Sequence, residues 1–153
     1  MKLFILRHGQ AEPQKTTDEA RELTGKGRED TKRVVSGRVA DMQSITEIWA
    51  SPLVRAQQTA HIAASYFPAL KIQTSELIIP ESSPIIAMSW LQSINQENLS
   101  ILLVSHQPFV GELVNKLCGK PAGFYPMGTS SLALIEAPVI AADMGELLWL
   151  DHA

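Results

Sequence analysis

Apolar and polar positions alternate along the chain in blocks of two kinds. Short apolar runs of strand length are separated by longer stretches whose apolar residues have the spacing of amphipathic helices. The pattern predicts strands at residues 2–6, 47–50, 70–75 and 100–105, followed by a late strand pair at 130–137 and 145–151. The predicted helices are a stretch that begins near Thr24, residues 52–67, residues 85–94 and residues 109–119.

Local signals mark where these helices begin and end. Ser51 and Pro52 are the residue types that favour the N-cap and the first helical position, and Pro68 is a stop signal. Pro108 opens the last helix and Gly119 closes it. Because strands and helices alternate, the sequence predicts an α/β fold with a largely parallel sheet, in one domain over residues 1–153.

Composition restricts the class of protein. A chain of 153 residues can bury one core, and 45% hydrophobic with 19% charged residues is ordinary for a globular protein rather than a disordered one. The net charge of -3 argues against a nucleic-acid or membrane-surface partner. The single Cys118 allows no internal disulfide, and no apolar stretch approaches the roughly 18 residues of a membrane span. We expect a soluble, cytoplasmic protein.

Unusual polar residues follow three of the predicted strands. Arg7 and His8 end the first, Arg55 lies in the first turn of the helix after the second, and His106 follows the strand at 100–105. Ligands of open parallel sheets bind at the carboxyl ends of the strands, where the helices begin. Two imidazoles, two guanidiniums and the free N–H groups of helix starts at one edge would suit a compact anion such as phosphate.

Each of these residues also has an ordinary structural interpretation when taken alone. Arg55 could be a solvated first-turn residue and His106 a capping residue, so the prediction depends on their shared position. His61 lacks that position and is expected on a helix surface or in packing, and His152 is expected to be mobile near the C-terminus. A zinc site made of His8, His106 and a carboxylate has no supporting ligand spacing. We therefore expect neither a metal nor another cofactor.

Three motifs occur in a fixed order: RHG after the first strand, SPLVRAQQTA at the second strand–helix junction, and SHQP after a later strand. Together they resemble the histidine phosphatase superfamily. Within it, the short length and the segment ARELTGKG are similar to the SixA-type phosphohistidine phosphatases. The resemblance covers essentially the whole chain and implies a three-layer α/β/α, phosphoglycerate-mutase-like fold. That fold has a mostly parallel central sheet and a late antiparallel strand pair.

The resemblance also implies roles for individual residues. His8 would be the nucleophile, and Arg7, Arg55 and His106 would complete the phosphate site. Arg21, in EARELT, is a candidate substrate contact at its rim. His8 must attack as a neutral imidazole, which the Arg7 cation should favour, while a backbone carbonyl near Gly9 would accept the other ring N–H.

The expected reaction is metal-independent and passes through phospho-His8, which water hydrolyses to inorganic phosphate. The substrate would be a phosphohistidine-bearing protein, either a phosphotransfer domain or a phosphocarrier, and the enzyme would act as a monomer. Alternatives are a phosphomonoesterase acting on small molecules or phosphoserine/phosphothreonine, and a non-catalytic phosphate-binding module. Mutase activity is less favoured, because the chain lacks room for a lid.

The general acid is left open by the sequence. Four carboxylates are candidates, namely Glu12, Asp18, Glu76 and Glu81, and none lies in an evident motif. An imidazole leaving group departs neutral when its distal nitrogen is already protonated, so it needs little help from an acid. Short loops would also leave the site open to a protein. Both features favour phosphohistidine on a protein as the substrate.

Overall fold

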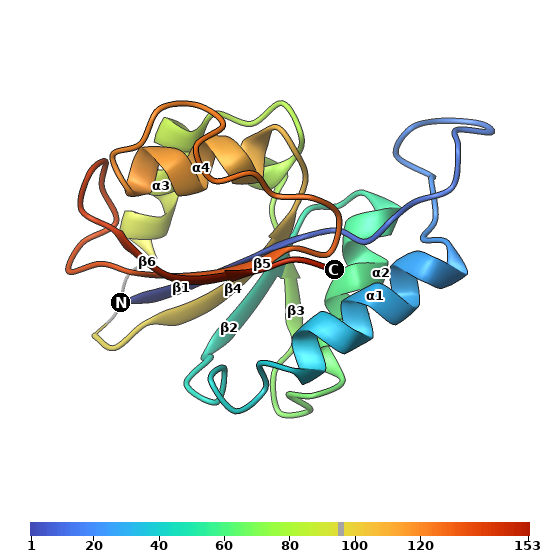
Figure 1. Cartoon of the computed structure of the whole chain (residues 1–153), viewed down its shortest axis with the longest axis horizontal. Coiled ribbons are helices and arrows are strands. Elements are labelled where there is room, and N and C mark those ends of the chain that lie inside the picture. Colours follow the sequence, from blue (N-terminus) through green and yellow to red (C-terminus); the bar gives the residue numbers. More distant parts are fainter. Residues whose placement is uncertain (95–96) are drawn as a thin grey trace.

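The structure is a computed structural model that describes residues 1–94 and 97–153. Its described part forms one six-stranded sheet with helices packed on both faces, which confirms the predicted three-layer α/β/α fold (Figure 1). In chain order the elements are β1 (Lys2–Arg7), α1 (Gly25–Ser36), β2 (Glu47–Ala50), α2 (Val54–Ala64), β3 (Ile72–Thr74), the 3₁₀ helix η1 (Glu76–Ile78), α3 (Pro84–Ser93), β4 (Ser100–Ser105), α4 (Phe109–Leu117), β5 (Leu132–Glu136) and β6 (Glu146–Asp151).

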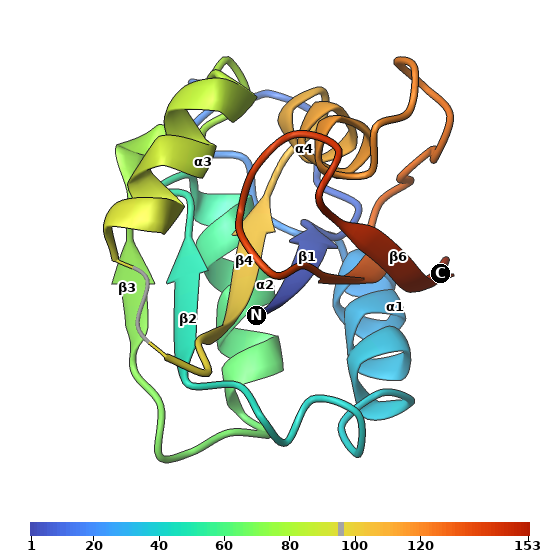
Figure 2. The same ribbon diagram turned by 90° about the vertical axis from the view of Figure 1, so that its left-hand side faces the viewer.

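The strands follow the order β3-β2-β4-β1-β5-β6. β1, β2, β3 and β4 run parallel, and their carboxyl ends meet at one edge of the sheet (Figure 2). β5 is antiparallel to β1, and β6 is antiparallel to β5. The late antiparallel pair is therefore confirmed, and it extends the sheet on the side of β1 opposite β4.

Two apolar layers enclose the sheet. One layer packs α3 and α4 against it, with Leu103 and Leu113 among its fully buried side chains. The other packs α1 and α2 against the opposite face, with Leu102 and Val104 at its centre. Every residue of β4 is buried, as expected for a central strand covered on both faces. Within the described residues, no helix is both long and apolar enough to cross a membrane.

The start of α1 was predicted correctly, whereas the start of α2 was not. The predicted helix start near Thr24 is confirmed: α1 begins at Gly25, and the Thr24 side chain caps it by accepting a hydrogen bond from the Gly27 amide at 2.9 Å. The predicted cap at Ser51 is wrong. α2 begins at Val54 after a bend, Leu53 occupies its N-cap position, and no side chain caps it. The Ser51 hydroxyl has a different partner, described below.

Other elements are shorter than predicted or were not predicted. α2 ends at Ala64, before Pro68, and β3 is confined to Ile72–Thr74 at the sheet edge. α4 ends at Leu117, and Gly119 follows with a positive φ of 63°. That conformation is one that glycine adopts at low cost just beyond a helix. The η1 turn after β3 was not predicted from the sequence.

The loop after β1 lies directly against the first turn of α1. A Cβ atom on Gly9 would lie 2.7 Å from the Gly27 carbonyl oxygen, and one on Gly27 would collide with the backbone of Gln10. The Gln10 carbonyl accepts a hydrogen bond from the Thr24 amide at 2.9 Å. The two glycines therefore permit a backbone-to-backbone approach that holds the chain immediately after His8.

This approach gives a matched pair of variants in α1. Gly27→Ala should lower the free energy of unfolding by about 1–3 kcal/mol, because the added methyl has no space against the Gln10 backbone. Gly25→Ala should be neutral or stabilise by up to about 1 kcal/mol, because nothing lies within 4 Å of its Cβ position. Urea unfolding curves measure both. Equal stability of the two variants would contradict the described packing.

Candidate active site

The four residues predicted at the carboxyl edge of the sheet lie together. Arg7 ends β1, His8 follows it, Arg55 lies in the first turn of α2, and His106 follows β4. β1 and β4 are paired in parallel, with Arg7 opposite Ser105, and the His8 amide donates to the Ser105 carbonyl at 2.9 Å. This pairing puts the two imidazole rings next to each other, with centroids 5.0 Å apart.

His8 is buried and its tautomer follows from one contact. Its Nδ1 lies 2.7 Å from the Gly9 carbonyl oxygen, which can only accept, so Nδ1 carries the hydrogen and Nε2 keeps the free lone pair. Burial lowers the pKa of His8 to about 4, assisted by the charges of Arg55 and Arg7, although the bond to Gly9 opposes the shift. A backbone carbonyl at Gly9 was predicted. Burial, rather than Arg7, is the main cause of the neutral state.

His106 is also buried and neutral. Burial lowers its pKa to about 3, with further contributions from His8 and Arg55. Its Nε2 lies 2.7 Å from the Ser51 hydroxyl oxygen, whereas its Nδ1 is buried without a hydrogen-bond partner among the described residues. The protein therefore binds one ring nitrogen, Nε2, and the other, Nδ1, is available to a ligand.

In each of the two arginines, as in His106, some side-chain nitrogens are bonded to the protein and one is not. Arg7 Nη1 donates to the Met127 carbonyl at 3.0 Å. Arg55 donates from Nη1 to the Asp18 carbonyl at 2.7 Å and from Nη2 to the Asp18 carboxylate at 3.1 Å. The Nε of each arginine is buried and has no partner in the described part of the chain.

Three buried polar atoms at one edge of the sheet thus lack partners among residues 1–94 and 97–153: Arg7 Nε, Arg55 Nε and His106 Nδ1. Buried polar groups in folded proteins are nearly always hydrogen-bonded, so three unpartnered ones in one place indicate a ligand-binding function. Guanidinium nitrogens only donate. The complementary ligand is an anion with several acceptor oxygens, such as a phosphoryl group beside the lone pair of His8.

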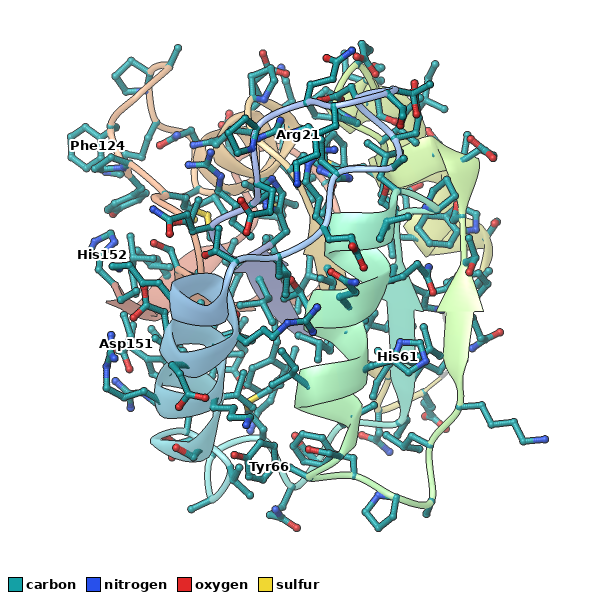
Figure 3. The ribbon with its side chains drawn as sticks, turned by 90° about the vertical axis from the view of Figure 1, so that its right-hand side faces the viewer. Arg21, His61, Tyr66, Phe124, Asp151 and His152 are labelled. Carbon is teal, nitrogen blue, oxygen red and sulfur yellow. The ribbon has the colours of Figure 1, made fainter. Side chains whose placement is uncertain are left out.

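Arg21 lies beyond the amino-terminal ends of α1 and α2, at the top of the view in Figure 3. Its Nε donates to the Glu12 carbonyl at 2.8 Å, and its Nη1 pairs with the Asp18 carboxylate at 3.0 Å. Asp18 therefore links Arg21 to Arg55 through its two carboxylate oxygens. The contact gives Arg21 a place at the rim of the candidate site.

The position of Asp18 bears on the search for a general acid. Its hydrogen bond from Arg21, and then that from Arg55, lowers the pKa of the Asp18 carboxyl, although partial burial opposes the shift. Asp18 is consequently ionised near neutral pH and is a poor proton donor. Its place in the structure is that of a carboxylate that orients two arginines.

Two side chains that hold the site were not predicted from the sequence. Ser51 was interpreted as a helix cap. Thr59, buried in α2, was given no role; its hydroxyl accepts from the Gly9 amide at 3.1 Å and donates to the Arg55 carbonyl at 2.7 Å. Both residues belong to the segment SPLVRAQQTA. Their place in that motif is the sequence feature that could have identified them as site residues.

The remaining histidines lie outside the site. His61 is exposed on α2, as predicted, and its Nδ1 lies 2.7 Å from the Gln57 carbonyl oxygen (Figure 3). His152 was predicted to be mobile, but its Nδ1 lies 2.9 Å from the Ser131 hydroxyl. In the described ranges, no three His, Cys, Asp or Glu side chains are grouped as a metal site would require.

The lowered pKa values predict a pH dependence. Because protonation of His8 is displaced to about pH 4 and that of His106 to about pH 3, both rings should stay neutral as the pH falls from 8 to 5. Imidazole ¹⁵N chemical shifts recorded across this range should be constant for both residues. Titration of either ring near pH 6.5, the ordinary value for histidine, would contradict the described burial.

Comparison with known proteins agrees with this geometry. The model of the histidine phosphatase superfamily (branch 1) matches residues 3–79. The chain is 36% identical to a phosphohistidine phosphatase SixA homolog of Haemophilus influenzae over 86% of this chain and 87% of the relative. It is 32% identical to phosphohistidine phosphatase SixA of Escherichia coli, over 86% of this chain and 81% of the relative.

A solved structure of the protein histidine phosphatase SixA, complexed with tungstate, superposes with a TM-score of 0.82. It has 25% sequence identity to this chain, and the match covers 98% of this chain and 96% of that one. The similarity therefore extends over all three layers of the fold and the edge of the sheet that carries the candidate site.

Proposed function

The chain belongs to the histidine phosphatase superfamily, and from that membership we propose that it is a protein phosphohistidine phosphatase acting through phospho-His8. The observation that carries this proposal is the set of three buried nitrogens without partners among the described residues, beside a neutral His8 with Nδ1 protonated. The substrate class is supported by the two relatives named as phosphohistidine phosphatases.

In the first step, the Nε2 lone pair of His8 attacks phosphorus and the N–P bond of the substrate breaks. A substrate imidazole whose distal nitrogen carries a proton leaves as a neutral ring. The phosphorylated His8 ring becomes cationic, because Nδ1 keeps its hydrogen. The Gly9 carbonyl oxygen, 2.7 Å from Nδ1, stabilises that charge. No side chain needs to give up a proton in this step.

In the second step, a water molecule attacks phosphorus and the bond between phosphorus and His8 Nε2 breaks. The electron pair returns to Nε2, which restores the neutral ring with its hydrogen on Nδ1. The water loses one proton to the solvent, and inorganic phosphate is released. Arg7, Arg55 and His106 donate hydrogen bonds to the phosphoryl oxygens in both steps and stabilise their charge.

The state of the Asp18 carboxylate bears on which leaving group the site can release. Asp18 is ionised and bound by two arginines, so it is unsuited to protonate an alkoxide. Esters of serine or sugars release an alkoxide that needs a proton donor, whereas a protonated phosphohistidine releases a neutral imidazole. This difference supports phosphohistidine over a phosphomonoester.

The surface beside the site has exposed apolar side chains that suit a protein substrate. Ile85 and Ile86, in the first turn of α3, are 59% and 57% exposed. α3 packs on η1, and the Ile78 carbonyl of η1 accepts from the Ser105 hydroxyl, the residue before His106. Adjacent exposed apolar side chains near a charged site suit a protein partner. We propose that a monomer binds this partner in the cytoplasm, where the unpaired Cys118 stays reduced.

Replacement of the nucleophile tests the covalent route. His8→Ala should lower the rate by about 10³-fold or more, because the variant lacks the Nε2 lone pair that attacks phosphorus. In the wild-type protein, rapid quenching followed by mass analysis under alkaline conditions should find a phosphoryl group on His8. Turnover of His8→Ala near the wild-type rate would overturn the assignment of His8.

Substrate preference tests the identity of the leaving group. The ratio kcat/KM for a phosphorylated histidine-phosphotransfer domain should exceed that for phosphoserine and for sugar phosphates. Glu76→Gln and Glu81→Gln should each change it little. A wide advantage for the esters, or loss of all activity in Glu76→Gln, would instead favour a phosphomonoesterase.

The rim residue can be tested with a charge-matched control. Arg21→Ala should raise KM for the phosphoprotein by about 5-fold, as expected for one charge at an interface, with a smaller effect on a low-molecular-weight substrate. Lys71→Ala removes an exposed cation just before β3, at the amino end of that strand and so away from the carboxyl edge that carries the site. It should leave KM unchanged. Equal effects of the two variants would contradict a role for Arg21 in binding the phosphoprotein.

A further inference from the structure

The hydroxyl of Ser51 is completely buried and lies 2.7 Å from His106 Nε2. Ser51 follows β2 and His106 follows β4, the neighbouring parallel strand, where Ala50 is paired with Val104. The Ser51 amide donates to the Val104 carbonyl at 3.0 Å. The contact between the two side chains is therefore fixed by the register of the sheet.

The direction of this hydrogen bond follows from counting donors and acceptors. The Ser51 hydroxyl oxygen accepts from the Leu53 amide at 3.4 Å, which leaves its single hydrogen in need of an acceptor. The acceptor that the structure provides is His106 Nε2. If Nε2 carried a hydrogen instead, the Ser51 hydroxyl hydrogen would be buried without that acceptor, at the cost of an unmade hydrogen bond.

The same count applies to the other ring nitrogen. His106 is neutral, so a hydrogen-free Nε2 requires a hydrogen on Nδ1. Nδ1 is buried and has no hydrogen-bond partner in the described part of the chain. In this tautomer it can donate to an anion, whereas in the opposite tautomer its lone pair would face the phosphoryl oxygens and repel them.

We infer that Ser51 is a positioning residue that donates to His106 Nε2 and so holds the hydrogen on Nδ1, where it can bind a phosphoryl oxygen. The inference rests on the proposed function for its consequence in catalysis, but the tautomer itself does not depend on any substrate. Ser51 acts through His106 and does not itself bind the phosphoryl group. α2 begins without its hydroxyl, so capping of that helix does not explain its burial.

The tautomer can be measured directly on the wild-type protein. Two-bond ¹⁵N–¹H correlation spectra of ¹⁵N-histidine-labelled enzyme distinguish a protonated ring nitrogen from an unprotonated one. For His106 we expect a protonated Nδ1 and an unprotonated Nε2 at pH 7. The opposite assignment would overturn the inference whether or not the protein hydrolyses phosphohistidine.

The consequence for binding and catalysis is measured with Ser51→Ala. We expect kcat/KM for the phosphoprotein to fall by about 10–100-fold, by analogy with the loss caused by removing groups that orient metal-bound imidazoles. The inhibition constant of vanadate should rise, and the His106 signals should shift toward the Nε2-protonated form. The vanadate inhibition constant and the His106 signals distinguish a change at His106 from a general loss of structure.

A matched control removes a hydroxyl at the other end of β4. Ser44 and Ser100 contact each other through their hydroxyl oxygens at 3.2 Å, so Ser44→Ala also deletes one hydroxyl–side-chain contact, here a partly buried one. It should change neither vanadate inhibition nor the His106 tautomer. If Ser51→Ala retains the wild-type tautomer and vanadate affinity, or if Ser44→Ala reproduces its effects, the proposed role of Ser51 is wrong.

Discussion

The site depends on one constraint: two guanidiniums and two imidazoles must lie together at the carboxyl edge of the sheet without the imidazoles adding further positive charge. Two guanidiniums and two imidazoles lie there, and the imidazole centroids are 5.0 Å apart. Burial meets this constraint by lowering the pKa of His8 to about 4 and that of His106 to about 3, so both rings remain uncharged. The net positive charge comes from the arginines alone. That arrangement yields a nucleophile and an anion site from the same four residues.

Neutral imidazoles have two tautomers, and the surrounding chain selects one for each ring. For His8 the Gly9 carbonyl takes the Nδ1 hydrogen, and Thr59 in turn holds the Gly9 amide. For His106 the Ser51 hydroxyl donates its hydrogen to Nε2. The two rings therefore present different atoms to a ligand, a lone pair from His8 and an N–H from His106, which is the complement that phosphoryl transfer to an imidazole requires.

Much of this arrangement could be predicted from the sequence. Strand ends are signalled locally, so the parallel fold and the shared edge of Arg7, His8, Arg55 and His106 followed from short apolar runs and the order of motifs. The start of α1 near Thr24 was equally local, because the amide that the Thr24 side chain caps is three residues away.

Contacts between distant segments could not be predicted in the same way. Asp18 meets Arg55 across 37 residues, and Ser51 meets His106 across 55. These contacts depend on loop conformations and on strand register, which residue types alone do not specify. Ser51 illustrates the error that results. A serine followed by proline has the local character of a helix start, yet the neighbouring strand supplies a stronger partner for its buried hydroxyl.

The central claim is that His8 and the three unpartnered donors form one phosphoryl site. A crystal structure of this protein with vanadate tests it most directly. We expect vanadium bonded to His8 Nε2, with vanadate oxygens about 2.7–3.2 Å from donor nitrogens of Arg7, Arg55 and His106. Vanadate bound without contact to His8, for example in the groove of about 500 Å³ between α1 and α2 that Arg28 and Lys32 help to line, would contradict the account.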